Sequence, residues 1–549
     1  MKQNNTAERK IAPQYDARGN PVWQTRMTSP DNTVAKLDMV PDRIIPVIFV
    51  PGVMGSNLKG IGPAKDVTWT LNNTASMLPW LGRGPEQRKA SLTPATMMVD
   101  DGGKLPGGTA QTVEELKRRG WGEVGAMSYS EFLVWLENAL NDFDQAKDGL
   151  RAGLIGKSLN VLTGEAALTR DEVGLSYRYR FPVHACGYNW LDSNARSAER
   201  LGKRIDEVIA RYRTEKRKCE KVIVVTHSMG GLVARHCSEV LGYRDKIFGI
   251  VHGVMPAIGA AAVYRRFKAG TEGPAAASKV LGENAAEMTA VLSSAPGPMQ
   301  LLPTPEYGNG WLKVRDGGKA VSLPQQGDPY GEIYTVRGKW WSMCEDRLIN
   351  PLNKETDAKK RQAQVDADWL GYLKLIKRDV KGFHTDIEQR YHANTFAFFG
   401  QSDKHKAYGM VNWDRDTHLD HVRTRANMPV PKMQEIMAAD ATTLRGTGAS
   451  TPDLLGTNRY PVFNAGGASY AELFHISDAE ESGDGTVPYR SGVAPKAHCK
   501  SMLKVEVEHE PAYKRSSGAD NERACIFTLR AIVQIAQAVQ QTALKYEDK

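Results

Sequence analysis

The sequence contains no long apolar run. Its mean hydropathy is -0.44, and no stretch approaches the roughly 20 consecutive apolar residues that span a bilayer. Residues 1–10 are polar and lack the apolar segment of a secretory signal peptide. We therefore expect a protein without a membrane span, cytoplasmic in the cell that makes it, which leaves that cell only through a signal-independent export machine.

Cysteine is also scarce. The chain has 6 cysteines, and none forms a Cys-x-x-Cys pair or a set with the spacing of metal ligands. Cys186 follows an expected strand and Cys237 lies on an expected helix, positions that favour buried thiols. The pattern argues against a disulfide framework and a structural zinc site, and we expect no cofactor.

A strong excess of one charge is missing as well. Lysine and arginine number 72 against 63 acidic residues, so the net charge is +9 and the pI is near 9.0. Basic and acidic residues alternate along most of the chain, and no DNA- or RNA-binding module is visible, so nucleic acid is not an expected partner. The basic surplus serves either solubility or attraction to an anionic phospholipid surface.

The chain does contain a strand, a tight turn and a helix around one serine. Residues 222–227 form a β-branched run typical of a buried parallel strand. A His-Ser-Met-Gly-Gly turn follows, and the apolar residues after it recur at helical spacing. This order is that of the nucleophile elbow of the α/β-hydrolase fold. Its strained turn presents a serine, here Ser228, above the sheet edge. Gly230 and Gly231 supply the small neighbours that the turn needs, whereas Thr226 replaces the usual first glycine.

An acid is expected after the serine in such a fold. Asp484 lies between two glycines, ahead of Thr486, Val487 and Pro488, which indicates a carboxylate on a sharp loop after a strand. The alternative is an ordinary surface turn, since Asp-Gly is a common turn dipeptide.

The base should follow the last strand. Alternation over residues 502–508 predicts that strand, and His509 comes next, before a long apolar-periodic helix. His498 lies too early and is interpreted as a surface histidine. We predict that His509 removes the Ser228 proton while Asp484 orients the imidazole and stabilises its cation.

The oxyanion hole is predicted from the first buried strand. Residues 44–50 run into a glycine-containing loop. In this fold one donor comes from that loop and the other from the residue after the nucleophile. We therefore expect the backbone N–H groups of Val53 and Met229 to bind the tetrahedral oxygen.

Four segments together resemble the ordered motifs of lipases related to lecithin:cholesterol acyltransferase. They are Pro51-Gly-Val-Met-Gly-Ser56, Ala185-Cys-Gly-Tyr-Asn-Trp190, Thr226-His-Ser-Met-Gly-Gly231 and Gly483-Asp-Gly-Thr-Val-Pro488. The second departs from the Tyr-Asp-Trp-Arg pattern of that group, because Asn189 and Leu191 replace the Asp and the Arg. Within the group, residues 118–124 and 128–133 look similar to the lipase effectors of bacterial type VI secretion systems.

The resemblance implies a function and partners. It implies hydrolysis of lipid carboxylic esters, of phospholipids above all, through an acyl-Ser228 intermediate. It also implies action on a phospholipid membrane surface, an immunity protein, a secretion-spike carrier and delivery into the periplasm of a target cell. Three alternatives remain open: a lipid acyltransferase, a small-molecule carboxylesterase, and a non-catalytic binding protein on a hydrolase scaffold.

The expected fold class is α/β, an α/β-hydrolase with a mostly parallel sheet flanked by helices and with large cap or lid insertions. The core should comprise residues 41–259, 391–400 and 476–549, interrupted by a first insertion at 57–175. The remaining parts are an N-terminal arm (1–40), a cap insertion (260–390) and a third insertion (401–475). The residues that could line an acyl groove under the cap, or simply fill its core, are Met255, Ile258, Val263, Met288, Met299, Leu301 and Leu302.

Two acidic segments are candidate metal sites. Residues 414–421 are rich in Asp and His, but their crowding matches no standard ligand loop, which favours a hydrogen-bonding loop. Asp478, Glu480 and Glu481 precede the expected acid and could bind calcium, which we treat as the less favoured interpretation. No metal ligand is therefore predicted.

Overall fold

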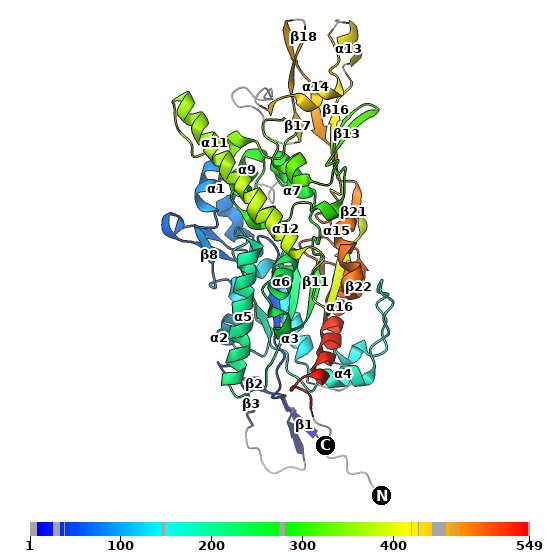
Figure 1. The fold of residues 1–549 in the computed structure, drawn as a ribbon. Coiled ribbons are helices and arrows are strands. Elements are labelled where there is room, and N and C mark those ends of the chain that lie inside the picture. The colour runs from blue at the N-terminus through cyan, green and yellow to red at the C-terminus, as the bar shows by residue number, and fades with distance from the viewer. Residues whose placement is uncertain are drawn as a thin grey trace.

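The computed structural model describes residues 8–25, 33–37, 39–143, 149–273, 280–418, 420–425, 428–441, 457–465 and 467–546. Its central element is a six-stranded sheet in the order β22-β14-β11-β10-β5-β9, of which β11 and β22 are labelled in Figure 1. Every neighbouring pair is parallel. The strands are β5 (Val47–Val50), β9 (Val183–Ala185), β10 (Val222–His227), β11 (Ile247–Gly253), β14 (Thr395–Gly400) and β22 (Cys499–Val505).

The strand order reverses direction between β5 and β10. The chain passes from β5 outward to the edge strand β9 and then returns to the other side of β5 with β10. The loops that leave the carboxyl ends of β5 and β10 therefore run apart and leave a crevice between them. In open parallel sheets ligands bind at such a reversal point.

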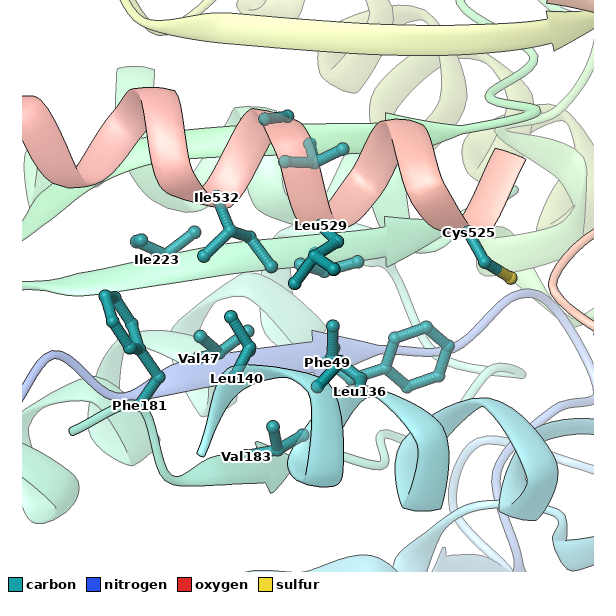
Figure 2. Close-up of a cluster of buried hydrophobic side chains, with 14 of the residues drawn as sticks. Val47, Phe49, Leu136, Leu140, Phe181, Val183, Ile223, Cys525, Leu529 and Ile532 are labelled. Carbon is teal, nitrogen blue, oxygen red and sulfur yellow. The ribbon is translucent and has the colours of Figure 1, made fainter. Parts of the chain in front are cut away.

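Helices cover both faces of the sheet, as its five wholly buried strands, all except the edge strand β22, require. Phe49 and Val225 point to one face, where they pack with α3 (Ala126–Leu140) and α16 (Ala519–Ala536); Leu136, Leu529 and other side chains of that layer are drawn in Figure 2. The alternate residues face the other side, which is covered by α5 (Asn194–Thr214) and α6 (Gly230–Glu239). The α/β-hydrolase fold predicted from the sequence is confirmed.

A second unit with its own core covers the edge of the six-stranded sheet at which the carboxyl ends of its parallel strands lie. It contains a five-stranded sheet in the order β13-β12-β16-β20-β17, which lies at the end of the molecule opposite the short N-terminal strands within residues 8–22 (Figure 1). We call the described residues within 258–380 and 408–476 the cap unit, because most of their buried apolar side chains form one cluster. Its strands are β12 (Leu312–Asp316), β13 (Lys319–Leu323), β16 (Val411–Arg415), β17 (Asn458–Arg459) and β20 (Phe474–Ile476). Its principal helices are α7 (Ala262–Ala269), α9 (Ala285–Leu292), α11 (Ala358–Lys374) and α14 (Met433–Ala438).

The cap unit differs from the two separate insertions expected at 260–390 and 401–475. Strand β12 comes from the first of them and pairs in parallel with β16 from the second, with Val314 opposite Trp413. The hairpin of β12 and β13 leaves one edge of β12 open, and β16 satisfies the backbone groups of that edge. The two excursions therefore share one sheet and one apolar core.

The first insertion also differs from a simple excursion, because α3 lies inside the hydrolase core. The rest of it forms a small sheet of β6 (Leu58–Gly60), β7 (Thr68–Trp69) and β8 (Met97–Val99), followed along the chain by α2 (Val113–Arg118) and α4 (Arg170–Ser176). A short 3-10 helix, η2 (Thr74–Trp80), connects two of its strands. Trp69 packs edge-on against Trp190, with ring centroids 5.3 Å apart, and so attaches this sheet to the core.

The N-terminal arm consists of two short strand pairs. The N-terminal arm pairs β1 (Glu8–Ile11) with β4 (Val34–Leu37) and β2 (Gln14–Tyr15) with β3 (Pro21–Val22), and Arg180 donates to its Gly19 carbonyl at 2.8 Å. All six cysteines are free thiols, and only Cys499 is partly exposed. Among the described helices, none combines the length and apolar character that a bilayer crossing needs.

The helix layer drawn in Figure 2 makes a testable prediction about stability. Leu529 is 1% exposed in α16, whereas Leu370 is 64% exposed in α11. Leu529→Ala leaves a cavity and should lower the free energy of unfolding by about 2–5 kcal/mol, while Leu370→Ala should change it by no more than about 0.5 kcal/mol. Calorimetric unfolding measures both, and equal effects would contradict this assignment of the core.

Candidate active site

Ser228 lies on a strained turn between β10 and α6. Its φ is 50°, a left-handed conformation that costs a non-glycine residue about 1–3 kcal/mol. The Ser228 N–H donates to the Gly253 carbonyl at 2.9 Å. A Cβ at Gly230 would lie 2.5 Å from the carbonyl oxygens of Val50 and Pro51, so only glycine fits there.

Thr226 shows why the first glycine of the usual elbow is dispensable here. Its side chain is buried, and its hydroxyl lies 3.0 Å from Nδ1 of His252 on the neighbouring strand β11. Burial lowers the pKa of His252 to about 3, so this imidazole is neutral and can pair with a hydroxyl. The hydroxyl of Thr226 is thus satisfied in the space beside the elbow.

The structure brings Ser228, His509 and Asp484 into hydrogen-bonding contact. His509 Nε2 lies 2.8 Å from Ser228 Oγ, and His509 Nδ1 lies 2.8 Å from Asp484 Oδ2. Because Nδ1 faces a carboxylate, it carries the ring hydrogen, and Nε2 is left to accept from the serine hydroxyl.

Asp484 is almost fully buried and is held by backbone donors. Its Oδ1 accepts from the N–H groups of Thr486 at 3.0 Å and Val487 at 2.6 Å. The residue follows β21 (Glu481–Gly483) and rests against the end of β14, where a Cβ on Gly400 would lie 2.5 Å from the Asp484 Cβ. These contacts orient the carboxylate toward His509.

His509 lies on the loop after β22, although the strand differs from its predicted bounds. Pairing with β14 ends at Gly400 opposite Val505, so the strand covers 499–505 in place of 502–508. His498 lies elsewhere, stacked on Tyr391 with its Nε2 2.8 Å from Gln389 Oε1.

The loop after β5 is fixed by three side chains. Tyr188 donates to the Pro51 carbonyl at 2.9 Å, Trp69 donates to the Met54 carbonyl at 3.0 Å, and the Gly52 N–H donates to the Tyr129 hydroxyl at 3.1 Å. Tyr188 belongs to the motif that lacks the usual Asp and Arg, so this part of the motif supports the loop.

The two predicted oxyanion donors flank this arrangement. Val53 follows Gly52 and lines the same cavity as Ser228, and Met229 follows Ser228 at the start of α6. Within the described part of the chain, neither backbone N–H has a hydrogen-bond acceptor. Both N–H groups are therefore available to donate a hydrogen bond to a bound ligand.

A largely apolar cavity of about 650 Å³ lies beside Ser228. Of the residues expected to line an acyl groove, Val263 and Leu301 do so, and the other five do not border the cavity. The first insertion also contributes to the lining, which was not predicted, although the Met-Leu-Pro-Trp run at 77–80 is an apolar signal visible in the sequence. The apolar lining residues from the first insertion are Trp69, Leu71, Met77, Leu78, Leu81 and Met127. Arg266 and Glu510 are the charged side chains among the described lining residues.

The segment 118–124 supports the scaffold. Arg119 is buried and pairs with Glu115 at 2.7 Å and Glu137 at 3.0 Å, and these carboxylates raise the pKa of Arg119 against the opposing effect of its burial. Glu123 accepts from Arg200 at 3.0 Å. These ion pairs hold α2 and α3 against the core.

The acidic segments form ion pairs within the protein. Asp414 pairs with Arg315, and Glu481 pairs with Arg490 at 2.6 Å. In the described ranges no group of three or more His, Cys, Asp or Glu side chains is arranged to hold a metal ion.

The contact between Gly400 and Asp484 makes a second prediction. In Gly400→Ala the new methyl displaces Asp484, and we expect Ser228 to react about 10- to 100-fold more slowly with a fluorophosphonate. Gly371→Ala in α11 is the matched control, since a Cβ there meets nothing within 4 Å. The labelling rate of Gly371→Ala should equal that of the parent, and an unchanged rate in Gly400→Ala would show that this contact does not position the acid.

Comparison with known proteins supports the fold. Residues 193–265, which include the elbow, match the model of the PGAP1-like alpha/beta domain. A solved structure, the Tle4-Tli4 complex, contains a chain with 27% sequence identity and a TM-score of 0.72, and the match covers 90% of this chain and 98% of that one. A comparison with curated proteins gives no match. The resemblance to type VI lipase effectors is thereby confirmed, and the chain has an α/β-hydrolase fold that is similar to Tle4 over most of its length.

Proposed function

We propose that the protein is a serine lipase or phospholipase that hydrolyses carboxylic esters of membrane lipids. The observation that carries the proposal is the relay from Ser228 Oγ through His509 to Asp484, with two contacts of 2.8 Å, beside a largely apolar cavity. Fold similarity to a lipase effector supports the lipid class of substrate.

The reaction follows from the tautomer of His509. Its Nε2 takes the Ser228 proton as Oγ attacks the ester carbonyl carbon, and Asp484 stabilises the imidazolium that forms. The N–H groups of Val53 and Met229 bind the oxyanion, an interaction worth about 3–4 kcal/mol per donor in comparable sites. The carbon–oxygen bond to the leaving alcohol then breaks, and that alcohol takes the proton from Nε2. Water, activated in the same way, releases the fatty acid from Ser228.

The cavity and its rim favour a lipid. Leu78 and Leu81 line it and are 59% and 39% exposed. Apolar side chains exposed next to an apolar cavity are suited to acyl chains, each methylene of which contributes about 0.8 kcal/mol when buried. A small-molecule carboxylesterase does not need such a rim. An acyltransferase shares the triad chemistry and differs only in the nucleophile that resolves the acyl-enzyme.

The biological setting is proposed from the similar structure. Tle4 is a type VI lipase effector, and its structure is that of a complex with the immunity protein Tli4. We propose that this chain is likewise exported by a type VI system, acts on phospholipid in the target-cell periplasm, and has its own immunity protein and a secretion-spike carrier. A catalytically idle binding protein would not need the Ser228, His509 and Asp484 contacts.

The triad is tested by single substitutions. Ser228→Ala and His509→Ala should each lower kcat on a lipid ester by at least about 10⁴-fold, because triad members act as one unit. His498→Ala is the matched histidine control, and its activity should stay close to that of the parent. An active Ser228→Ala enzyme would remove the proposed function.

The substrate class is tested by comparing rates on soluble butyrate esters and on phospholipid vesicles with long acyl chains. We expect faster turnover on vesicles, with a further gain on anionic vesicles that fades with salt, since screening shortens to about 8 Å at physiological ionic strength. Leu78→Ser should lower the ratio of vesicle to butyrate rates, and Leu370→Ser in α11, which is not among the residues that line the cavity, should not. A parent enzyme that prefers butyrate would indicate a small-molecule esterase.

A further inference from the structure

His227, the residue before Ser228, contacts the predicted base through the backbone. It is 4% exposed at the end of β10. Its Nδ1 lies 3.0 Å from the Tyr129 hydroxyl, and its Nε2 lies 2.8 Å from the carbonyl oxygen of His509. Both ring nitrogens of His227 therefore have a hydrogen-bond partner. One partner is the carbonyl of His509, whose imidazole contacts Ser228.

The hydrogen atoms in this chain of contacts follow from the partners. The Gly52 N–H donates to the Tyr129 oxygen, so the hydroxyl hydrogen can be donated onward to His227 Nδ1. The His509 carbonyl only accepts, so His227 Nε2 must carry the ring hydrogen. A neutral imidazole satisfies both contacts, and burial, reinforced by the neighbouring His509, lowers the pKa of His227 to about 3. Burial also raises the pKa of Tyr129, which keeps its hydroxyl hydrogen in place.

These contacts fix the main chain of His509 on two sides. Its N–H donates to the Asp484 carbonyl at 2.8 Å, and its C=O accepts from His227. One anchor comes from the residue of the acid and the other from the residue next to the nucleophile. With both anchors present, the imidazole moves only by rotation about its own side-chain bonds.

We propose that His227 and Tyr129 are positioning residues, which hold the His509 main chain at its working distance from Ser228 and connect it to the loop of Gly52. The inference rests on the proposed function, because it concerns the base of that reaction. Loss of the His227 donor removes one of the two anchors, and a displacement of about 1 Å in a catalytic group can cost about 100-fold in rate.

The chain offers a matched control with the same pattern of bonds. The Tyr330 hydroxyl lies 2.8 Å from His384 Nδ1, and His384 Nε2 lies 2.9 Å from the Gln300 carbonyl oxygen. His384 is 5% exposed in α12 (Lys381–Ile387), does not line the Ser228 cavity, and has its pKa lowered by burial to about 4. Its replacement removes the same two hydrogen bonds from a buried site and leaves the base untouched.

The test measures kcat and KM on a soluble short-chain ester, together with the melting temperature of each variant. His227→Phe should lower kcat about 100-fold, with KM within about twofold of the parent. In His227→Gln the amide nitrogen reaches the place of Nε2 and donates to His509, so kcat should recover by at least about tenfold. Asparagine reaches only the place of Nδ1, and His227→Asn should stay as slow as His227→Phe. His384→Phe should lower the melting temperature without lowering kcat.

Two results would overturn the proposal: equal kcat values for His227→Gln and His227→Asn, or a loss of kcat in His384→Phe as large as that in His227→Phe. If His227→Phe does not fold, the comparison of glutamine with asparagine decides alone. Survival of activity in Ser228→Ala removes the proposed function itself. An inactive Ser228→Ala enzyme with unaffected His227 variants removes only the positioning role.

Discussion

Helix α6 begins in contact with the end of strand β5, and this close approach determines where Ser228 and the loop of Gly52 lie. The carbonyl oxygens of Val50 and Pro51 leave no room for a side chain at Gly230. The chain must therefore turn sharply at Ser228, and the serine accepts a left-handed backbone whose strain the buried strands on both sides can support. Because β5 and β10 are neighbours in the sheet, the loop of Gly52 and the serine hydroxyl meet at one point.

The substrate side is built from parts of the chain that are far apart in sequence. The first insertion contributes Trp69, Leu78 and Met127 to the cavity, and the cap unit contributes Val263 and Leu301. His509 and Asp484 reach the same place from two later loops of the chain. A cavity with this construction can vary its lining through the insertions while the sheet and the elbow remain unchanged.

The parts of the fold that could be predicted carry local signals. Buried parallel strands appear as β-branched runs, and the elbow, the acid loop and the histidine after the last strand each lie within a few residues of such a run. The pairing of β12 with β16 could not be predicted, because it joins short strands about a hundred residues apart that have no periodicity in common. The contacts of His227 and Tyr129 were missed for a similar reason: a histidine beside a serine, and a tyrosine on a core helix, have no sequence pattern that identifies a hydrogen bond between them.

The six free cysteines have a consequence for where the protein can work. Burial raises the pKa of Cys186 to about 11 and those of Cys219 and Cys499 to about 12, and only the thiolate form exchanges or oxidises readily. No bridge has to form for the chain to fold, and few thiolates are present to react afterwards. A protein with this chemistry keeps the same covalent structure in a reducing cytosol and in an oxidising envelope, so the export proposed above would require no redox maturation.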